Sequence, residues 1–443
     1  MTDQFEALRT QYGTFHYHGY HIAREPDCIT LRFDFSIDGL CEFHPVTTID
    51  TRGLPLRSAC GSPLARELVF ALGLVELVSY WKCACPPVVK IHCGALDAEE
   101  IAWWKRLWYH GLGEFFYRNG IAAGFDSFVT VECGGNVRSF LPGSDFHPMG
   151  VSLVPVGGGK DSCVTLQLLR EMGRPLCGLT VNDQPARAET FAAAGFAPDR
   201  LLRTHRTIDP ALLARNAEGF LNGHTPFSAI VAFLGIYCAY LIGAGELVLS
   251  NEASANEASV PGTDVNHQYS KSYQFERGFN AYLARRLGLP IRYFSLLRPF
   301  HELQIARQFA ALPQYHLAFK SCNAGSKRNA WCGRCAKCLF VYLMLAPFLP
   351  ETRMVEIFGE NLLQKPELQD ELSALLGKTH EKPFECVGTV EEALAAFELL
   401  EGRPAHAQAR ALKLLRSWNP AHNIPAEFLP AVERMHAYVS AAV

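Results

Sequence analysis

From about residue 151 the chain alternates short apolar runs with helical stretches, and this alternation restricts its fold more than any other feature. The expected elements, in chain order and starting with a strand, are Val151–Val156, Ser162–Met172, Leu176–Val181, Ala186–Ala194, Leu201–Thr204, 225–245, 247–250, 272–287, Ile291–Phe294 and 300–311. Short apolar strands that alternate with helices predict an α/β fold with a doubly wound parallel sheet.

The flanking segments follow other patterns. Thr30–Ile37 alternates apolar and polar residues, which predicts half-exposed antiparallel strands, and helical runs follow at 64–81 and 97–118. After residue 350 the apolar spacing of Val390–Leu400 and Ala405–Trp418 predicts helices. The expected domains are an N-terminal α+β domain at 1–150, a parallel-sheet domain at 151–350 and a mostly helical C-terminal region at 351–443.

Cysteine content and the N-terminal residues bear on the cellular compartment. The chain has 15 cysteines in 443 residues, and an odd number in a long chain argues against a secreted disulfide framework. Met1–Phe15 carries charges and no apolar run, so we expect no signal peptide. The uncharged stretch 225–245 contains a proline and three glycines and leads into Leu247–Leu249, which favours a buried helix before a buried strand over a membrane span. We therefore expect a cytoplasmic protein without a membrane segment.

Charge is balanced over the chain but not along it. Lys and Arg number 41 against 44 Asp and Glu, whereas proteins that bind long nucleic acids usually carry a positive excess. We therefore expect no nucleic-acid partner. Between Leu303 and Pro350 there is no acidic residue, which suits a small anionic ligand. The main cations there are Arg307, Lys320, Lys327, Arg328, Arg334 and Lys337.

A glycine loop follows the first predicted strand of the parallel sheet. In the sequence Gly157-Gly158-Gly159-Lys160-Asp161-Ser162, successive backbone N–H groups can turn toward one point, and the start of the next helix adds its dipole. The loop can therefore bind a polyphosphate. It is not a Walker A motif, because Val154 stands where that motif has glycine and Asp161 where it has Ser or Thr. A glycine-rich turn without a nucleotide is the alternative.

The loop resembles the PP-loop of the ATP pyrophosphatases, S-G-G-x-D-S, with Gly157 in place of the first serine. The resemblance implies an adenine nucleotide alpha hydrolase-like fold, cleavage of ATP to AMP and pyrophosphate, and transfer of AMP to a substrate oxygen. It also implies that Asp161 approaches Mg²⁺ and that adenine lies near Asn182 and Asp183, at the carboxyl edge of the sheet. The residues expected to bind ATP are Gly157, Gly158, Gly159, Lys160, Asp161, Ser162 and Asn182.

Four cysteines lie within 17 positions of the chain, at Cys322, Cys332, Cys335 and Cys338. A C-x-x-C turn places two sulfurs on one ion, and zinc favours four thiolates in a tetrahedron. We therefore expect a structural zinc ion, whose excess negative charge the cations of 303–350 would offset. An iron–sulfur cluster and uncoordinated buried thiols are the alternatives.

A PP-loop followed by four cysteines also resembles 7-cyano-7-deazaguanine synthase over about 151–340, and Gly223–Pro226 is similar to a segment of that family. A PP-loop enzyme that modifies a nucleobase or tRNA is therefore an alternative function. A zinc-stabilised module that senses ATP without turning it over is a third.

A wider resemblance rests on six further segments, which are Gly113–Gly120, Ser250–Ser254, Pro261–Gln268, Tyr293–Pro299, Trp331–Cys338 and Lys382–Gly388. Together with the glycine loop they resemble the ATP-dependent UDP-N-acetylmuramoyl-L-alanyl-L-glutamate epimerases. This implies an isomerase of peptidoglycan synthesis, and so of cell-wall biogenesis, cell shape and cell division. It implies ATP and magnesium as well, and a small nucleotide-sugar dipeptide whose terminal L-glutamate is inverted to D-glutamate.

The implied reaction explains why an epimerase would need ATP. Adenylation removes the charge of the carboxylate beside Cα, so a modest base can take the Cα proton. We expect the acid/base pair among Cys386, His267, His224 and Glu252, with Asp161 at the magnesium. Thiols suit proton transfer at Cα, and both histidines lie in predicted loops. A buried structural cysteine and hydrogen-bonded loop histidines are the alternatives.

Overall fold

The structure is a computed structural model, which describes residues 2–134, 146–260, 262–263, 265–379, 383–402 and 408–441. Some parts of the sequence motifs lie outside the described residues. They are Pro261 and Asp264 of one segment, Lys382 of another, and the first residues of the helix expected from Ala405.

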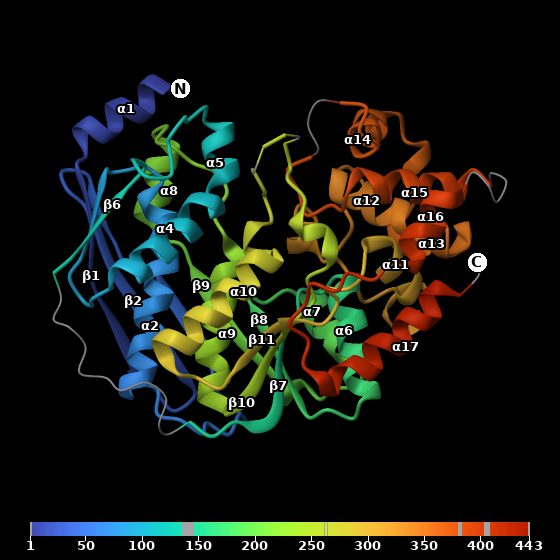
Figure 1. Cartoon of the computed structure of the whole chain (residues 1–443), viewed down its shortest axis with the longest axis horizontal. Coiled ribbons are helices and arrows are strands. Elements are labelled where there is room, and N and C mark those ends of the chain that lie inside the picture. Colours follow the sequence, from blue (N-terminus) through green and yellow to red (C-terminus); the bar gives the residue numbers. More distant parts are fainter. Residues whose placement is uncertain are drawn as a thin grey trace.

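The chain is a mixed α/β protein built on one 11-stranded sheet (Figure 1). The strand order is β11-β10-β7-β8-β9-β4-β2-β1-β5-β6, with β3 beside β2. The strands are β1 (Thr14–Arg24), β2 (Cys28–Ile37), β3 (Cys41–Phe43), β4 (Val46–Asp50), β5 (Val88–Ile91), β6 (Thr130–Cys133), β7 (Met149–Pro155), β8 (Leu176–Val181), β9 (Leu201–Thr207), β10 (Ala244–Leu249) and β11 (Arg292–Ser295).

Strands β7 to β11 pair in parallel, and helices connect them as the apolar alternation predicted. Neighbouring side chains of one strand enter different cores, because strand residues alternate between the two faces. Leu153 and Leu247 belong to one core, and Val154 and Val248 to the other, so helices cover both faces. The connecting helices are α6 (Lys160–Glu171), α7 (Pro185–Ala193), α8 (Pro210–Ala217), α9 (Phe227–Ile242) and α10 (Tyr273–Tyr282).

The apolar stretch before β10 forms the buried helix α9, as expected. Gly243 ends this helix with a left-handed backbone (φ 74°), which a glycine adopts without strain, and the chain enters β10 directly. Among the described residues, no helix has the length and apolarity needed to cross a bilayer.

The N-terminal strands extend the same sheet. β1, β2 and β4 pair antiparallel, and residues of β2 alternate between buried and more exposed positions, which confirms the expectation for Thr30–Ile37. β4 pairs antiparallel with β9, so the sheet continues across the predicted boundary at residue 150. That domain division stays a prediction. The N-terminal helices are α1 (Thr2–Gln11), α2 (Pro63–Glu76), α3 (Val78–Trp81), α4 (Ala98–Gly111) and α5 (Gly113–Arg118).

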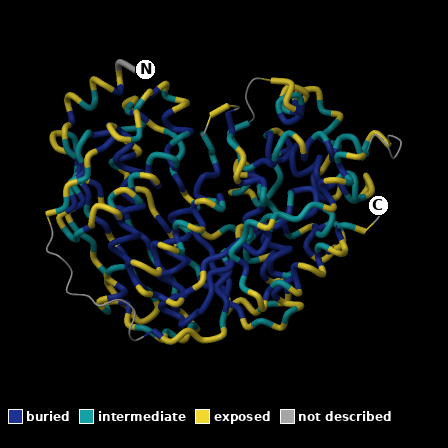
Figure 2. The backbone as a smooth tube through the Cα atoms, viewed as in Figure 1, coloured by how far each residue is buried: buried dark blue, intermediate teal, exposed yellow. Residues whose placement is uncertain are grey.

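The C-terminal part is mostly helical, as its apolar spacing predicted, and its helices gather on one side of the molecule (Figure 1, orange and red). They pack with α6 around the core that contains Val154 and Val248, and Figure 2 shows buried residues in the interior of this part. The helices are α11 (Glu302–Ala310), α12 (Ala336–Leu345), α13 (Glu351–Phe358), α14 (Gln369–Leu375), α15 (Val390–Leu400), α16 (Ala409–Arg416) and α17 (Leu429–Ser440).

Candidate active site

A cavity of about 340 Å³ lies at the carboxyl ends of β7, β8 and β10. This is the edge at which open parallel sheets bind ligands. Its wall combines the glycine loop, the segment after β10, the segment around Cys322, and Cys386. The residues that line it include Gly157, Gly159, Asp161, Ser162, Arg187, Glu252, Lys271, Lys320, Ser321, Lys337 and Cys386.

The glycine loop joins β7 to α6 with no side-chain cap on the helix. Gly158 has a left-handed backbone (φ 81°), and a Cβ on Gly159 would come within 3.2 Å of the Cβ of Ser321, so both positions favour glycine. Ser162 Oγ donates to the carbonyl of Gly159 (2.8 Å). The first-turn N–H groups of α6 face this end of the sheet, which suits an anion.

Lys160 is buried and directed at carboxylates. Its ammonium donates to Asp161 Oδ1 (2.5 Å) and to Glu302. Burial favours the neutral amine, but the two carboxylates outweigh it and raise the pKa of Lys160. Burial raises the pKa of Glu302 above its usual value, and the ammonium of Lys160 acts against this shift. The lysine therefore holds the start of α6 to the start of α11.

Three carboxylates meet beside this lysine. One oxygen each of Asp161, Glu252 and Glu302 lies within 4.8 Å of the others. Burial opposes ionisation of Asp161, yet Lys160 and then Lys337 hold the pKa of its carboxyl below the usual value. Hard divalent cations such as Mg²⁺ prefer oxygen ligands of this kind, so these residues fit the expected ion.

Cys386 lines the cavity and faces two cationic side chains, Lys271 and His267. Lys271 Nζ lies 3.1 Å from its Sγ, and the imidazole of His267 interacts electrostatically with the same thiol. Burial favours the neutral thiol, but Lys271, His267 and Lys337 outweigh it and hold the pKa of Cys386 well below its usual value. The structure thus places a thiol with a lowered pKa in the cavity wall.

Both predicted histidines meet one buried carboxylate behind this thiol. Glu114 Oε2 lies 2.5 Å from His267 Nδ1 and 3.7 Å from His224 Nδ1, and the two rings are 4.3 Å apart. Burial lowers the pKa of His267, but Cys386 and Glu114 together raise it to about 9. Burial and the neighbouring His267 lower the pKa of His224 to about 4. At neutral pH His267 is therefore charged and His224 is not.

The two residues expected near adenine lie at the end of β8. Asn182 has a left-handed backbone (φ 60°), and its Oδ1 accepts a hydrogen bond from the backbone N–H of Arg206 (2.7 Å). Asp183 is exposed and lies 3.7 Å from Arg203. From the same segment, Val181 and Arg187 line the cavity.

Sequence reasoning missed three residues of the site, Glu114, Lys271 and Glu302. Glu114 lies inside the segment Gly113–Gly120, so the resemblance contained that signal, but its partner histidine is 153 positions away. Lys271 follows a recognised motif by three residues, and a lone lysine there gives no signal of its own. Glu302 is the first residue of α11, and no sequence pattern links it to the glycine loop. Lys337 was expected among the cations of 303–350, but not as a partner of Cys386.

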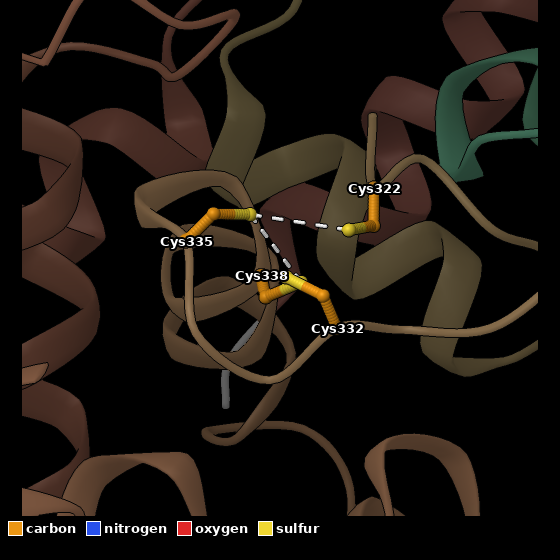
Figure 3. Close-up of side chains that lie close together, drawn as sticks. All are labelled: Cys322, Cys332, Cys335 and Cys338. Atoms are coloured by element: carbon orange, nitrogen blue, oxygen red, sulfur yellow. Dashed lines mark hydrogen bonds between the residues drawn. The ribbon is translucent and has the colours of Figure 1, made fainter. Parts of the chain in front are cut away.

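The four cysteines converge as predicted, and their sulfurs point toward one another (Figure 3). Sγ–Sγ distances are 4.0 Å for Cys322–Cys335 and 3.6 Å for both Cys332–Cys338 and Cys335–Cys338. A tetrahedral zinc with Zn–S bonds of about 2.3 Å puts its sulfurs about 3.8 Å apart, so the four thiols fit one zinc ion.

The cysteine site also adjoins the cavity. The backbone N–H of Lys320, two residues before Cys322, donates to the carbonyl of Gly158 (2.7 Å). Lys337, between Cys335 and Cys338, donates through Nζ to the backbone carbonyl of Cys386. One metal site can thus fix both the glycine loop and the thiol.

The fold and the site define an α/β enzyme whose cavity is lined by a glycine loop and by a thiol with a lowered pKa. Comparison with known proteins gives the family. The MurL N-terminal domain matches residues 6–296, and the MurL C-terminal domain matches 318–427. The chain therefore belongs to the MurL family, and it is an isomerase.

Three relatives are named UDP-N-acetyl-alpha-D-muramoyl-L-alanyl-L-glutamate epimerase. The chain is 37% identical over 406 residues to that of Xanthomonas oryzae pv. oryzae, covering 88% of each chain. It is 38% identical over 379 residues to that of a Micromonospora species, covering 83% of each. It is 36% identical over 388 residues to that of Salinispora tropica, covering 83% of this chain and 81% of the relative.

Proposed function

We propose that this enzyme inverts the terminal L-glutamate of UDP-N-acetylmuramoyl-L-alanyl-L-glutamate to D-glutamate, with ATP and Mg²⁺, through an acyl-adenylate. The names of its relatives support the substrate. The observation that carries the ATP-dependent mechanism is that one cavity is lined by both the glycine loop and Cys386. Phosphates held at the loop would lie in the same space as a thiol that can act on Cα.

In this proposal the parallel half of the sheet is a doubly wound PP-loop unit that binds ATP. The strand order, the helices on both faces and the cavity at the carboxyl edge support it. Four cations line the cavity and suit the phosphates of ATP and of the nucleotide-sugar. They are Arg187, Lys271, Lys320 and Lys337.

The proposed chemistry has three steps. A carboxylate oxygen of the glutamate attacks the α-phosphorus of ATP, and pyrophosphate leaves. A base then takes the Cα proton, whose electron pair passes into the enolate, and an acid returns a proton on the opposite face. Water finally cleaves the acyl-adenylate to the dipeptide and AMP. The acid/base groups belong to the set Cys386, His267, His224 and Glu252.

Two metal ions complete the proposal. Asp161, with Glu252 and Glu302, would hold Mg²⁺, which supplies charge neutralisation at the phosphates. The four cysteines would hold a structural zinc ion. Since Lys320 and Lys337 join this site to Gly158 and Cys386, zinc would stabilise the cavity wall.

The test is to incubate the protein with ATP, Mg²⁺ and the UDP-linked dipeptide and to measure AMP and D-glutamate. Both products are expected, and Asp161→Asn should lower both. The absence of both would contradict the epimerase proposal. AMP that forms only with a nucleobase acid would instead support the deazaguanine-type alternative.

A further inference from the structure

We propose that Glu114 is a positioning residue, which orients His267 so that His267 and Lys271 hold Cys386 as the thiolate that takes the Cα proton. The identity of that proton rests on the proposed function. The ionisation of Cys386 does not depend on the proposed function, and it can be tested without ATP or substrate.

The two oxygens of Glu114 have separate partners. Oε2 faces His267 Nδ1 at 2.5 Å, and Oε1 accepts from Arg118 Nη1 at 3.3 Å. The carboxylate lies on α5 and is 6% exposed, so its orientation is fixed by packing. A carboxylate at Nδ1 keeps the proton on that nitrogen and leaves the other ring nitrogen for a further partner.

That further partner is Cys386, because the same imidazole interacts with its thiol and lowers the pKa of that thiol. A carboxylate, an imidazole and a thiol in series are the arrangement that activates cysteine in other enzymes, where the acid orients the imidazole. Of the three residues, Cys386 lines the cavity. We therefore assign proton transfer to the thiol and orientation to Glu114.

Charged groups face the thiol from several elements. Lys271 lies 3.1 Å from Sγ, Lys337 binds the backbone carbonyl of Cys386, and Glu385 is its neighbour in the chain. His267 in turn faces Glu114 and the neutral His224. Two ammonium groups and one imidazolium thus surround the thiolate, against the carboxylate of Glu385 nearby.

The proton step follows from this arrangement. As the Cα–H bond breaks, an S–H bond forms on Cys386, and the electron pair of the broken bond passes into the enolate of the adenylated glutamate. Lys271 and His267 stabilise the thiolate before this step, so removing either charge should raise the pKa of Cys386.

The test measures alkylation of Cys386 by iodoacetamide between pH 5 and 10, with peptide mass mapping to separate this cysteine from the others. At pH 6 only roughly 0.3% of a thiol with a pKa of about 8.5 is ionised. We expect wild-type Cys386 to react at least about tenfold faster than such a thiol at pH 6. We expect Glu114→Gln to slow the reaction about tenfold at pH 6 but little at pH 9, because one pKa unit is a tenfold change in ionisation.

The control is Glu218→Gln, which changes an exposed carboxylate that pairs with Arg215. It should leave the profile of Cys386 unchanged. A wild-type profile that rises only near pH 8.5 would overturn the proposal, as would a Glu114→Gln profile that superimposes on wild type. If Glu114→Gln does not fold, Lys271→Met and the wild-type profile decide instead.

A second readout separates this inference from the proposed function. In Glu114→Gln, AMP formation should stay within a few-fold of wild type, while deuterium exchange at Cα falls about 100-fold. If wild type forms neither AMP nor D-glutamate, the proposed function fails, and the alkylation profile still decides the role of Glu114.

Discussion

The ammonium of Lys160, the first residue of α6, is paired with the carboxylate of Glu302, the first residue of α11, and each side chain is only 3% exposed. Asp161 shares this ammonium. The pair therefore joins the helix that follows the glycine loop to the helix that carries a third carboxylate of the site. Breaking a buried pair leaves an uncompensated charge, which costs more than an exposed pair contributes.

We predict that Lys160→Met lowers the free energy of unfolding by about 3–5 kcal/mol, because Glu302 and Asp161 lose their shared cation. Urea denaturation followed by circular dichroism measures this. Lys90→Met is the control, because Lys90 is 42% exposed and pairs loosely with Glu132 at 3.7 Å, so it should change stability by less than about 1 kcal/mol. Equal urea midpoints for the two variants would contradict the structural role of Lys160.

We predict that Cys386→Ser slows deuterium wash-in at Cα by about 100-fold or more, because a serine hydroxyl stays protonated where the thiol is ionised. AMP formation should fall by less than about tenfold, since the glycine loop is untouched. Mass spectrometry of the dipeptide and an AMP assay give the two rates. Cys28→Ser, in β2 of the N-terminal sheet, is the matched control. Full exchange in Cys386→Ser would remove this residue from the acid/base set.

The local parts of the fold and site follow from sequence because their signals lie within a few residues. The strands and helices of 151–311, the glycine loop and the four cysteines are of this kind, since turn chemistry and apolar spacing act over short separations. The pairing of β4 with β9 could not be predicted in this way. It joins Val46–Ile49 to Thr204–Thr207 across about 160 residues, and nothing in either strand specifies its partner.

The electrostatics of the site could not be predicted from the sequence for the same reason. Cys386 was a candidate from sequence, but its ionisation depends on Lys271, 115 positions earlier, and on His267. Glu114 can be recognised as a residue of the site only because the fold places it beside His267. A single lysine or glutamate forms no sequence pattern that would mark it as functional. The candidate acid/base residues could therefore be predicted from sequence, whereas their pKa values depend on the neighbours that the fold provides.

We predict that the charge of His267 stabilises the protein at neutral pH and that this contribution is lost in alkali. Its pKa is raised from 6.5 to about 9, so the contribution is complete below pH 6.5 and disappears as pH rises through 9. The shift corresponds to about 3 kcal/mol. The free energy of unfolding of wild type minus that of His267→Gln should therefore shrink by about this amount between pH 6 and 10.

The control for this titration is His205→Gln, because His205 is an exposed residue of β9. Its free energy of unfolding should stay within about 0.5 kcal/mol of that of wild type. A stability difference for His267→Gln that does not change with pH, or that grows with pH, would show that the imidazole is not held in its charged form.

We predict that the protein contains one zinc ion and that removing it weakens ATP binding as well as stability. The four sulfurs fit one tetrahedral ion. Lys320, just before the first cysteine, binds Gly158, and Lys337, between the last two cysteines, binds Cys386. Cys335→Ser should lose the metal, lower the melting temperature by several degrees and weaken ATP binding about tenfold or more. Elemental analysis, thermal melting and calorimetric titration with ATP measure the three effects, with Cys28→Ser as control. Iron with sulfide in the elemental analysis would instead support a cluster, and a metal-free protein with normal ATP binding would leave the four thiols as packing residues.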